Sequence, residues 1–290
     1  MSATPLAWGG RSIPAPGGLP AVAVSLTGPS LAQARSQARS AIDAGADVLE
    51  LRVDLLEETG ALAAPDPLDA ATAAAQVLEC LRGLGEIIAA DGADAGAGAP
   101  LLLTCRTAAE GGRAHLDDTA YGSLLRSVLD GLTDWTPERR PAAIDVEVQR
   151  GCLPQVCAQA HALSIDVVAS FHDFEATPAD EVLEEVLARM AREGADLAKI
   201  AVWPASADDV ARLLGVCARA TAGAGEGTGL GVPVAAMSMG ALGAVSRVAP
   251  AFGSALTFAV VPDGQGQSRA SAPGQLPIQD VRRCLELLRA

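Results

Sequence analysis

Eight short apolar segments, rich in Val, Leu, Ile and Ala, recur along this chain and alternate with longer segments of helical periodicity. We expect strands near residues 21–26, 47–54, 100–106, 142–148, 165–172, 197–203, 233–239 and 255–261. This alternation is typical of a parallel sheet whose strands are joined by crossover helices. Eight such strands predict an α/β fold, a single (β/α)8 TIM barrel in which residues 1–290 form one catalytic domain.

Three stretches lie outside this pattern. Residues 1–20 precede the first expected strand, and we expect them to form a small hairpin that closes the barrel floor. The Gly- and Ala-rich stretches 91–99 and 221–231 are interpreted as loops before the third and seventh strands, on the non-catalytic face. The sequence assigns them no role.

Charge and composition exclude several classes of function. A net charge of −14 leaves no basic stripe for nucleic acid, although a small anionic substrate remains compatible with it. The longest uncharged stretch, 227–246, is broken by glycines and a proline, so we expect no membrane span. Residues 1–20 lack a basic region followed by an apolar run, so we expect no secretory signal either. The six cysteines form no CxxC pair and no Cys/His cluster. We therefore expect a cytoplasmic protein with reduced, buried cysteines and no metal site.

In a (β/α)8 barrel the active site lies at the carboxyl ends of the strands, so polar residues spaced by two at these ends point together into the mouth. The segment LELRVD places Glu50, Arg52 and Asp54 on one face. Both faces of a parallel barrel are covered, so three inward charges indicate a functional site.

Polar residues also end the later strands. Arg106 ends the third, with Glu110 one turn later, and Ser170 and His172 share a face at the end of the fifth. Lys199 lies within the sixth strand and is the only lysine beside 20 arginines. A buried lysine is rare, and a guanidinium cannot form an imine, so this position indicates a Schiff-base chemistry.

Neighbouring strands lie about 4.8 Å apart, so His172 and Lys199 are expected to reach one substrate, with His172 as general acid and base. Arg247 follows the seventh strand, and Ser271 and Gln275 follow the eighth. The glycines of the segment 262–275 predict a mobile cover over the site.

Taken together, these segments resemble type I 3-dehydroquinate dehydratase, the Schiff-base enzyme of the shikimate pathway. The resemblance runs from about residue 21 to 275 and rests on the motifs ELRVD, TCRTAAEGG, SFHDF, ADLAKIAV, MSMG…SR…FGS and SAPGQ, taken jointly and in order. Trp203 departs from it, since a smaller or more flexible apolar residue is expected there, and its side chain is large enough to narrow the pocket.

The resemblance implies a role for each site residue. Lys199 forms the imine, His172 transfers the proton and Glu110 pairs with His172. The other expected residues contact the substrate: Glu50, Arg52 and Arg106 its hydroxyls, Arg247, Ser271 and Gln275 its carboxylate, and Ser25 the edge of the site. The resemblance also implies a homodimer.

The implied reaction dehydrates 3-dehydroquinate to 3-dehydroshikimate without a cofactor, because the lysine itself supplies the electron sink. Two alternatives remain at this point. A class I aldolase-type barrel acting on a phosphorylated sugar would use the same lysine chemistry but would need a phosphate cradle after the last two strands. A non-catalytic ligand-binding barrel would form no covalent adduct with its ligand.

Overall fold

The computed structural model describes residues 4–14, 17–63, 69–91, 99–222, 229–262 and 270–289. In these residues, eight strands form the wall of a barrel and each pairs in parallel with its neighbour along the sheet. The wall strands are β3 (Ala21–Leu26), β4 (Val48–Arg52), β5 (Leu101–Thr104), β6 (Ala143–Glu147), β7 (Asp166–Asp173), β8 (Leu197–Val202), β9 (Val234–Ser238) and β10 (Leu256–Val260). The predicted α/β barrel is confirmed, although most strands are shorter than expected at one or both ends.

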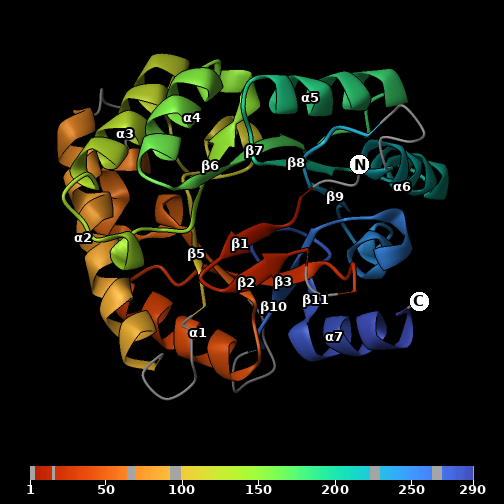
Figure 1. Ribbon diagram of the computed structural model, residues 1–290, viewed down its shortest axis with the longest axis horizontal. Coiled ribbons are helices and arrows are strands. Elements are labelled where there is room, and N and C mark those ends of the chain that lie inside the picture. The colour runs from red at the N-terminus through yellow and green to blue at the C-terminus, as the bar shows by residue number, and fades with distance from the viewer. Residues whose placement is uncertain are drawn as a thin grey trace.

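Helices surround this wall on the outside (Figure 1). The α-helices are α1 (Leu31–Asp43), α2 (Ala70–Asp91), α3 (Asp118–Gly131), α4 (Leu153–Ala162), α5 (Asp180–Arg192), α6 (Ala207–Thr221) and α7 (Ile278–Leu287). Short 3-10 helices fill several connections, namely η1 (Val53–Leu55), η2 (Glu57–Ala63), η3 (Ala108–Glu110), η4 (Pro137–Arg139), η5 (Val148–Arg150), η6 (Ala244–Val248) and η7 (Pro250–Phe252). In the described residues, η6 and η7 stand between β9 and β10 in place of an α-helix.

The sequence of α1 illustrates how these helices form. Ser30 caps its first turn by accepting a hydrogen bond from the backbone N–H of Gln33, whose side chain reaches back to the Ser30 N–H. The buried face of α1 consists of Ala34, Ala38 and Ala41. Side chains this small let the helix lie close to the strands, which explains how a chain with 3% aromatic residues fills its core.

The sheet order ends at β9 on one side and at β10 with the short strand β11 (Leu276–Pro277) on the other. The ring closes between β9 and β10, where the N–H of Ala255 donates to the carbonyl of Val234 at 2.7 Å. The Ser254 hydroxyl completes this seam by accepting the N–H of Ala236 at 3.3 Å.

An N-terminal hairpin closes the floor of the barrel, as predicted. Strands β1 (Leu6–Trp8) and β2 (Arg11–Ile13) are antiparallel and are joined by two glycines with positive φ, the geometry of a tight hairpin turn. Trp8 is fully buried, and its indole N–H donates to Asp166 at the start of β7 at 2.7 Å. It packs with Ile13 on the inward apolar residues of the strands, which include Ala21, Val48, Leu102, Ala143, Val168, Leu197, Ala235 and Leu256.

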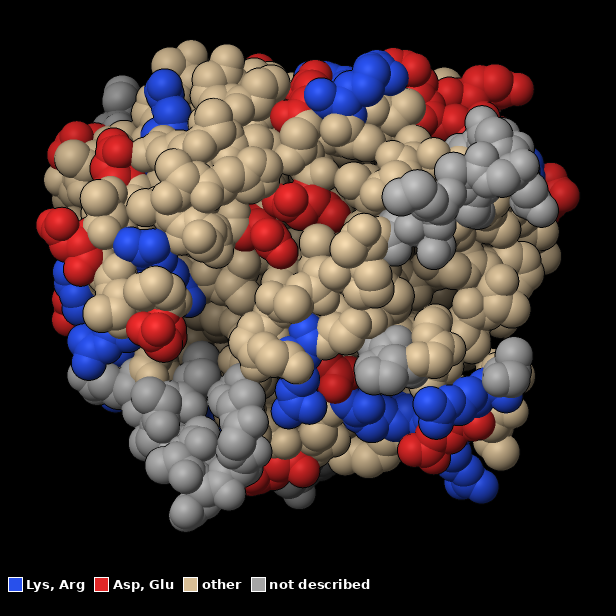
Figure 2. All heavy atoms as spheres, in the orientation of Figure 1, with Lys and Arg blue, Asp and Glu red and all other residues tan. Residues whose placement is uncertain are grey.

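The charged residues of the surface carry both signs. Figure 2 shows Arg side chains interspersed with Asp and Glu around the rim of the face that carries the hairpin. No helix among the described residues is long and apolar enough to cross a membrane.

All six cysteines are free thiols, and four of them are buried. Of the two Gly- and Ala-rich stretches, residues 92–98 and 223–228 lie outside the described residues.

Candidate active site

A pocket of about 480 Å³, including its part open to solvent, lies at the carboxyl ends of the wall strands. Nine of the ten predicted site residues line it: Glu50, Arg52, Arg106, Glu110, His172, Lys199, Arg247, Ser271 and Gln275. The tenth, Ser25, donates to the carboxylate of Glu50 and accepts a hydrogen bond from Ser271 at 2.8 Å. Met237, Met239 and Phe258 also line the pocket and were not predicted, because apolar residues at strand ends do not differ from core residues in the sequence.

Lys199 is 4% exposed and lies on β8 directly opposite Ser170 of β7. Its Nζ is 3.2 Å from Oδ2 of Asp145 and 3.7 Å from Oε1 of Glu50. The ammonium also lies 4.6 Å from the centre of the Phe258 ring. The buried amine is thus compensated by two carboxylates and an aromatic face, while it remains part of the pocket wall.

His172 and Glu110 form the second functional pair. His172 Nδ1 lies 2.8 Å from Oε2 of Glu110. Burial raises the pKa of Glu110 to about 8, against the opposing effect of Arg106. Burial, together with the charges of Arg106 and Lys199, lowers the pKa of His172 well below its usual value. Among the described residues Nε2 of His172 has no partner, which leaves this nitrogen available to a ligand in the pocket.

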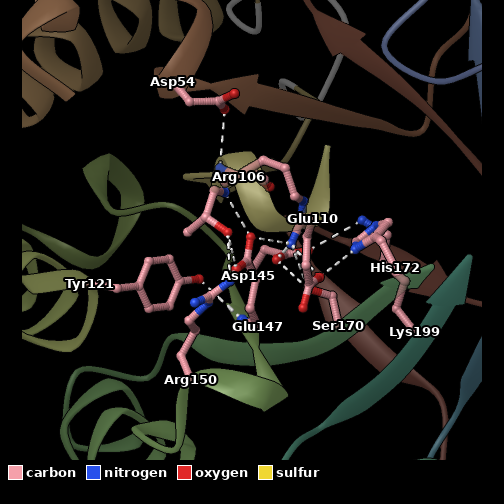
Figure 3. A network of polar contacts seen from close by, with 12 residues as sticks. Asp54, Arg106, Glu110, Tyr121, Asp145, Glu147, Arg150, Ser170, His172 and Lys199 are labelled. Atoms are coloured by element: carbon pink, nitrogen blue, oxygen red, sulfur yellow. Dashed lines mark hydrogen bonds and ion pairs between the residues drawn. The ribbon is translucent and has the colours of Figure 1, made fainter. Parts of the chain in front are cut away.

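Arg106 is the centre of a buried polar network (Figure 3). Its guanidinium donates to Asp145 at 2.7 Å, to Glu147 at 3.1 Å and to the hydroxyl of Ser170 at 2.9 Å. It also lies 3.5 Å from Glu110. Asp145 and Glu147 were not among the predicted residues, although the segment IDVE shows the same alternation of charge and apolar side chain as LELRVD.

The predicted inward position of Asp54 is wrong. Strand β4 ends at Arg52, and the chain turns into η1, so Asp54 does not line the pocket. Its carboxylate instead accepts two hydrogen bonds from the guanidinium of Arg52, both at 2.8 Å. It also accepts the backbone N–H groups of Arg106 and Arg113, each at 3.1 Å. Asp54 therefore holds Arg52 in place.

Arg247 differs from the other cations of the pocket. It is 2% exposed, and among the described residues no carboxylate lies within ion-pair distance of it. In the part of the chain that the structure describes, its guanidinium donates to the carbonyls of Pro273, at 3.1 Å, and Phe258, at 3.4 Å, and more weakly to the sulfur of Met237. Burial lowers its pKa to about 10. Its Nε has no hydrogen-bond partner among the described residues. A buried cation without a counter-charge is suited to bind an anion.

The segment after β10 meets the pocket through two polar side chains. Gln275 donates to the Ser271 hydroxyl at 2.9 Å, and Ser271 donates to Ser25. Half of the mobile cover predicted for 262–275, residues 263–269, lies outside the described residues, so the cover stays a prediction. Trp203 does not narrow the pocket, because it is 37% exposed and lies against Gly240 instead.

The described residues hold no group of three or more His, Cys, Asp or Glu side chains placed to bind a metal ion. The fold and the pocket together define a (β/α)8-barrel enzyme whose site is built around one lysine. The family model described as type I 3-dehydroquinase matches residues 22–290, and the chain belongs to this family.

Two curated relatives illustrate the similarity. The 3-dehydroquinate dehydratase of Lactiplantibacillus plantarum is 36% identical over 274 residues, which cover 93% of each chain. The enzyme of the same name from Klebsiella pneumoniae is 35% identical over 271 residues, 92% of each chain. A crystal structure of 3-dehydroquinate dehydratase from Geobacillus kaustophilus superimposes with a TM-score of 0.79 at 30% identity, covering 99% of this chain and 97% of the other.

Proposed function

We propose that this protein dehydrates 3-dehydroquinate to 3-dehydroshikimate through a Schiff base on Lys199, with residues 1–290 acting as one catalytic domain. The observation that carries the proposal is the set of side chains that line the pocket. The only lysine of the chain lines the same pocket as a histidine–glutamate pair and an arginine that has no carboxylate partner within the described ranges. The names of the relatives agree with this reaction.

The charges of the pocket support a substrate with a single carboxylate. Arg52 is paired with Asp54, and Arg106 with Asp145 and Glu147, whereas Arg247 has no carboxylate partner among the described residues. We propose that the substrate carboxylate binds Arg247, together with Ser271 and Gln275. An arginine–carboxylate pair is charge-assisted and provides the strongest polar contact available in the pocket.

Other side chains of the pocket are suited to the substrate hydroxyls. Glu50 and Arg52 line the pocket with an acceptor and a donor, and the hydroxyl of Ser25 lies next to Glu50. Arg106 also lines the pocket, although its described contacts are to protein groups. Its contact with a substrate hydroxyl, implied by the resemblance, stays a prediction.

The chemistry follows from these positions. The ε-amino group of Lys199 adds to the ketone at C3, and loss of the ketone oxygen as water leaves a protonated imine. The imine draws electron density toward nitrogen and so acidifies the C2–H. His172 removes this proton, and the C1 hydroxyl departs as water with a proton that His172 returns. Hydrolysis of the imine then releases the enone product and the free amine.

The two alternative functions fit the pocket less well. A phosphorylated sugar would bring a dianion, and Arg247 is a single buried cation rather than a cradle of backbone amides. A binding protein without catalysis would not need the buried His172–Glu110 pair beside the lysine.

The test combines two assays of the purified protein with 3-dehydroquinate. Formation of 3-dehydroshikimate is followed by its ultraviolet absorbance, and borohydride is added to trap the imine for mass spectrometry. We expect turnover and an adduct on Lys199, and neither in Lys199→Arg, with the same thermal unfolding curve to show an intact fold. Turnover by Lys199→Arg would exclude the imine mechanism. The expected homodimer and cytoplasmic location stay predictions, the first of which light scattering tests.

A further inference from the structure

Asp145 is a buried carboxylate to which the chemistry above assigns no part. It is completely buried and does not line the pocket, whereas Lys199 does. Its Oδ2 lies 3.2 Å from Nζ of Lys199, closer than the carboxylate of Glu50 at 3.7 Å. Asp145 therefore contacts the reacting nitrogen without being exposed to a ligand in the pocket.

Asp145 is also held in one orientation. Its Oδ1 accepts hydrogen bonds from Arg106 at 2.7 Å and from the Ser170 hydroxyl at 2.6 Å. Both donors are themselves buried, so they fix Oδ1 and leave Oδ2 directed at the lysine. Burial by itself would raise the pKa of Asp145, but Arg106, Lys199 and Ser170 outweigh it and lower the pKa, so the group is ionised in the free protein.

Glu50 does not offer the same arrangement. It lines the pocket, and its two oxygens already accept hydrogen bonds from Thr104 and Ser25. A ligand in the pocket would compete for it. Asp145 is shielded from the ligand and therefore stays beside the lysine nitrogen through every step.

We propose that Asp145 is the proton acceptor of Lys199 during imine formation and the counter-ion of the imine once it has formed. The proposal rests on the proposed function and deepens it. An ammonium and a ketone give a protonated imine and water, so two of the three ammonium protons leave with the ketone oxygen. Asp145 takes the first proton, which frees the nitrogen lone pair to form the C–N bond. The nitrogen then passes a second proton to the former ketone oxygen. Asp145 returns its own proton to the nitrogen, which passes one proton on to the hydroxyl as the C–O bond breaks. Asp145 is a carboxylate again when the imine carries its charge.

The test measures imine formation by itself. Enzyme and 3-dehydroquinate are mixed at saturating substrate, quenched with borohydride after increasing times, and the adduct on Lys199 is counted by mass spectrometry. In Asp145→Asn we expect adduct formation to slow by about 10²–10⁴-fold, the range for a positioned acid or base. We expect KM to change little, because Asp145 does not line the pocket.

Glu147→Gln is the matched control. Glu147 lies on the same strand, is equally buried and also binds Arg106, but it does not contact Lys199. We expect it to slow adduct formation at least tenfold less than Asp145→Asn does. Ser170→Ala, which removes one donor to Asp145, covers the case in which Asp145→Asn does not fold, and we expect about a 3–10-fold slowing of the same step, a loss on the scale of one hydrogen bond.

Each outcome decides the assignment. If the wild type forms no adduct, the proposed function fails and the role of Asp145 fails with it. If the wild type forms the adduct and Asp145→Asn forms it equally fast, only the assignment of Asp145 is overturned. Equal slowing by Glu147→Gln and Asp145→Asn would mean that both act through Arg106, which also overturns it. If Asp145→Asn does not fold, adduct formation by Ser170→Ala at the wild-type rate overturns it as well.

Discussion

The floor and the mouth of the barrel are built by the same strands but hold opposite kinds of side chain. At the floor, the inward residues of β7 and β8 are Val168 and Leu197, which pack in one cluster with Trp8 of the hairpin. Two residues further along each strand, the inward positions are Ser170 and Lys199. A single step of the β-strand period therefore separates an apolar layer from a polar one.

This difference shows how the barrel tolerates a site of buried charges. The apolar floor contributes hydrophobic stabilisation without touching the ligand. The mouth contains charges whose desolvation is offset by partners, as in the pairs of Arg52 with Asp54 and of Arg106 with Asp145. Stability and chemistry are thus assigned to different layers, and mutations in the two layers should have different effects.

The largest effect on chemistry is expected at the mouth, in His172→Ala. The variant loses the group that moves the C2 proton, so we expect kcat to fall by about 10²–10⁴-fold. The imine is formed before this step, so the borohydride-trapped adduct should accumulate, the opposite of the result expected for Asp145→Asn. His161→Ala, at a surface histidine paired with Asp196, is the control and should keep full activity. Normal turnover by His172→Ala would place the base elsewhere, with Glu50 the next candidate.

The matching change at the floor is Trp8→Ala. Removing a fully buried tryptophan should lower the free energy of unfolding by about 3–5 kcal/mol, measured by denaturant unfolding. At a temperature where the variant stays folded, kcat should remain within about twofold of the wild type, because Trp8 does not line the pocket. A twofold change corresponds to roughly 0.4 kcal/mol in the activation free energy. Trp203→Ala, at a half-exposed tryptophan, should cost less stability. A large loss of kcat in folded Trp8→Ala would show that the two layers are coupled.

A smaller effect is expected in substrate binding. Arg247→Ala removes a charged hydrogen bond to the substrate carboxylate, a contact of about 1.5–3 kcal/mol, so KM should rise by roughly 10–100-fold. Gln275→Ala removes a neutral hydrogen bond of about 0.5–1.5 kcal/mol, for a rise of roughly 2–10-fold. Steady-state kinetics of the two variants measures this order. An equal rise in both would argue against Arg247 as the main carboxylate anchor.

The smallest expected effect is a shift in pH dependence. The Glu110–His172 pair acts as a base only after it loses its shared proton, and the pKa of Glu110 is raised to about 8. Activity should therefore fall as the pH is lowered through about 8. In Glu110→Gln the loss of activity at low pH should depend on His172 alone. Burial and the charges of Arg106 and Lys199 lower the pKa of His172, so the midpoint of this loss should move below the ordinary value of 6.5. If the midpoint of the pH–activity profile does not move, Glu110 takes no part in the proton transfer.

The sequence predicted the wall strands and most of the pocket because both depend on local pattern. The alternation of apolar and charged residues in LELRVD correctly placed Glu50 and Arg52 in the mouth. It failed at Asp54, because the periodicity cannot show where β4 ends and η1 begins. At that position the contact with Arg52, rather than the strand period, decides the direction of the side chain.

The polar network behind the lysine could not be predicted in the same way. Asp145 and Glu147 follow the same alternation on β6, but a pattern does not show which inward carboxylate meets which cation. That depends on the stagger between strands, which brings Asp145 of β6 to Lys199 of β8 across the intervening β7. The register of neighbouring strands, absent from the sequence, therefore determines the partner of the reactive amine.

The chain has a single lysine, Lys199, and this residue is 4% exposed at the pocket wall. An amine-directed label has no other lysine side chain to modify, so its incorporation at Lys199 reports whether the pocket is empty or occupied. Amine-acylating agents modify many surface lysines in most proteins, but in this chain the only lysine side chain that they can modify is the buried Lys199. Attachment of a dye or a solid support would have to use a different functional group, such as the partly exposed thiols of Cys152 and Cys284. Counting the labelled fraction would then give a titration of active sites that needs no measurement of turnover.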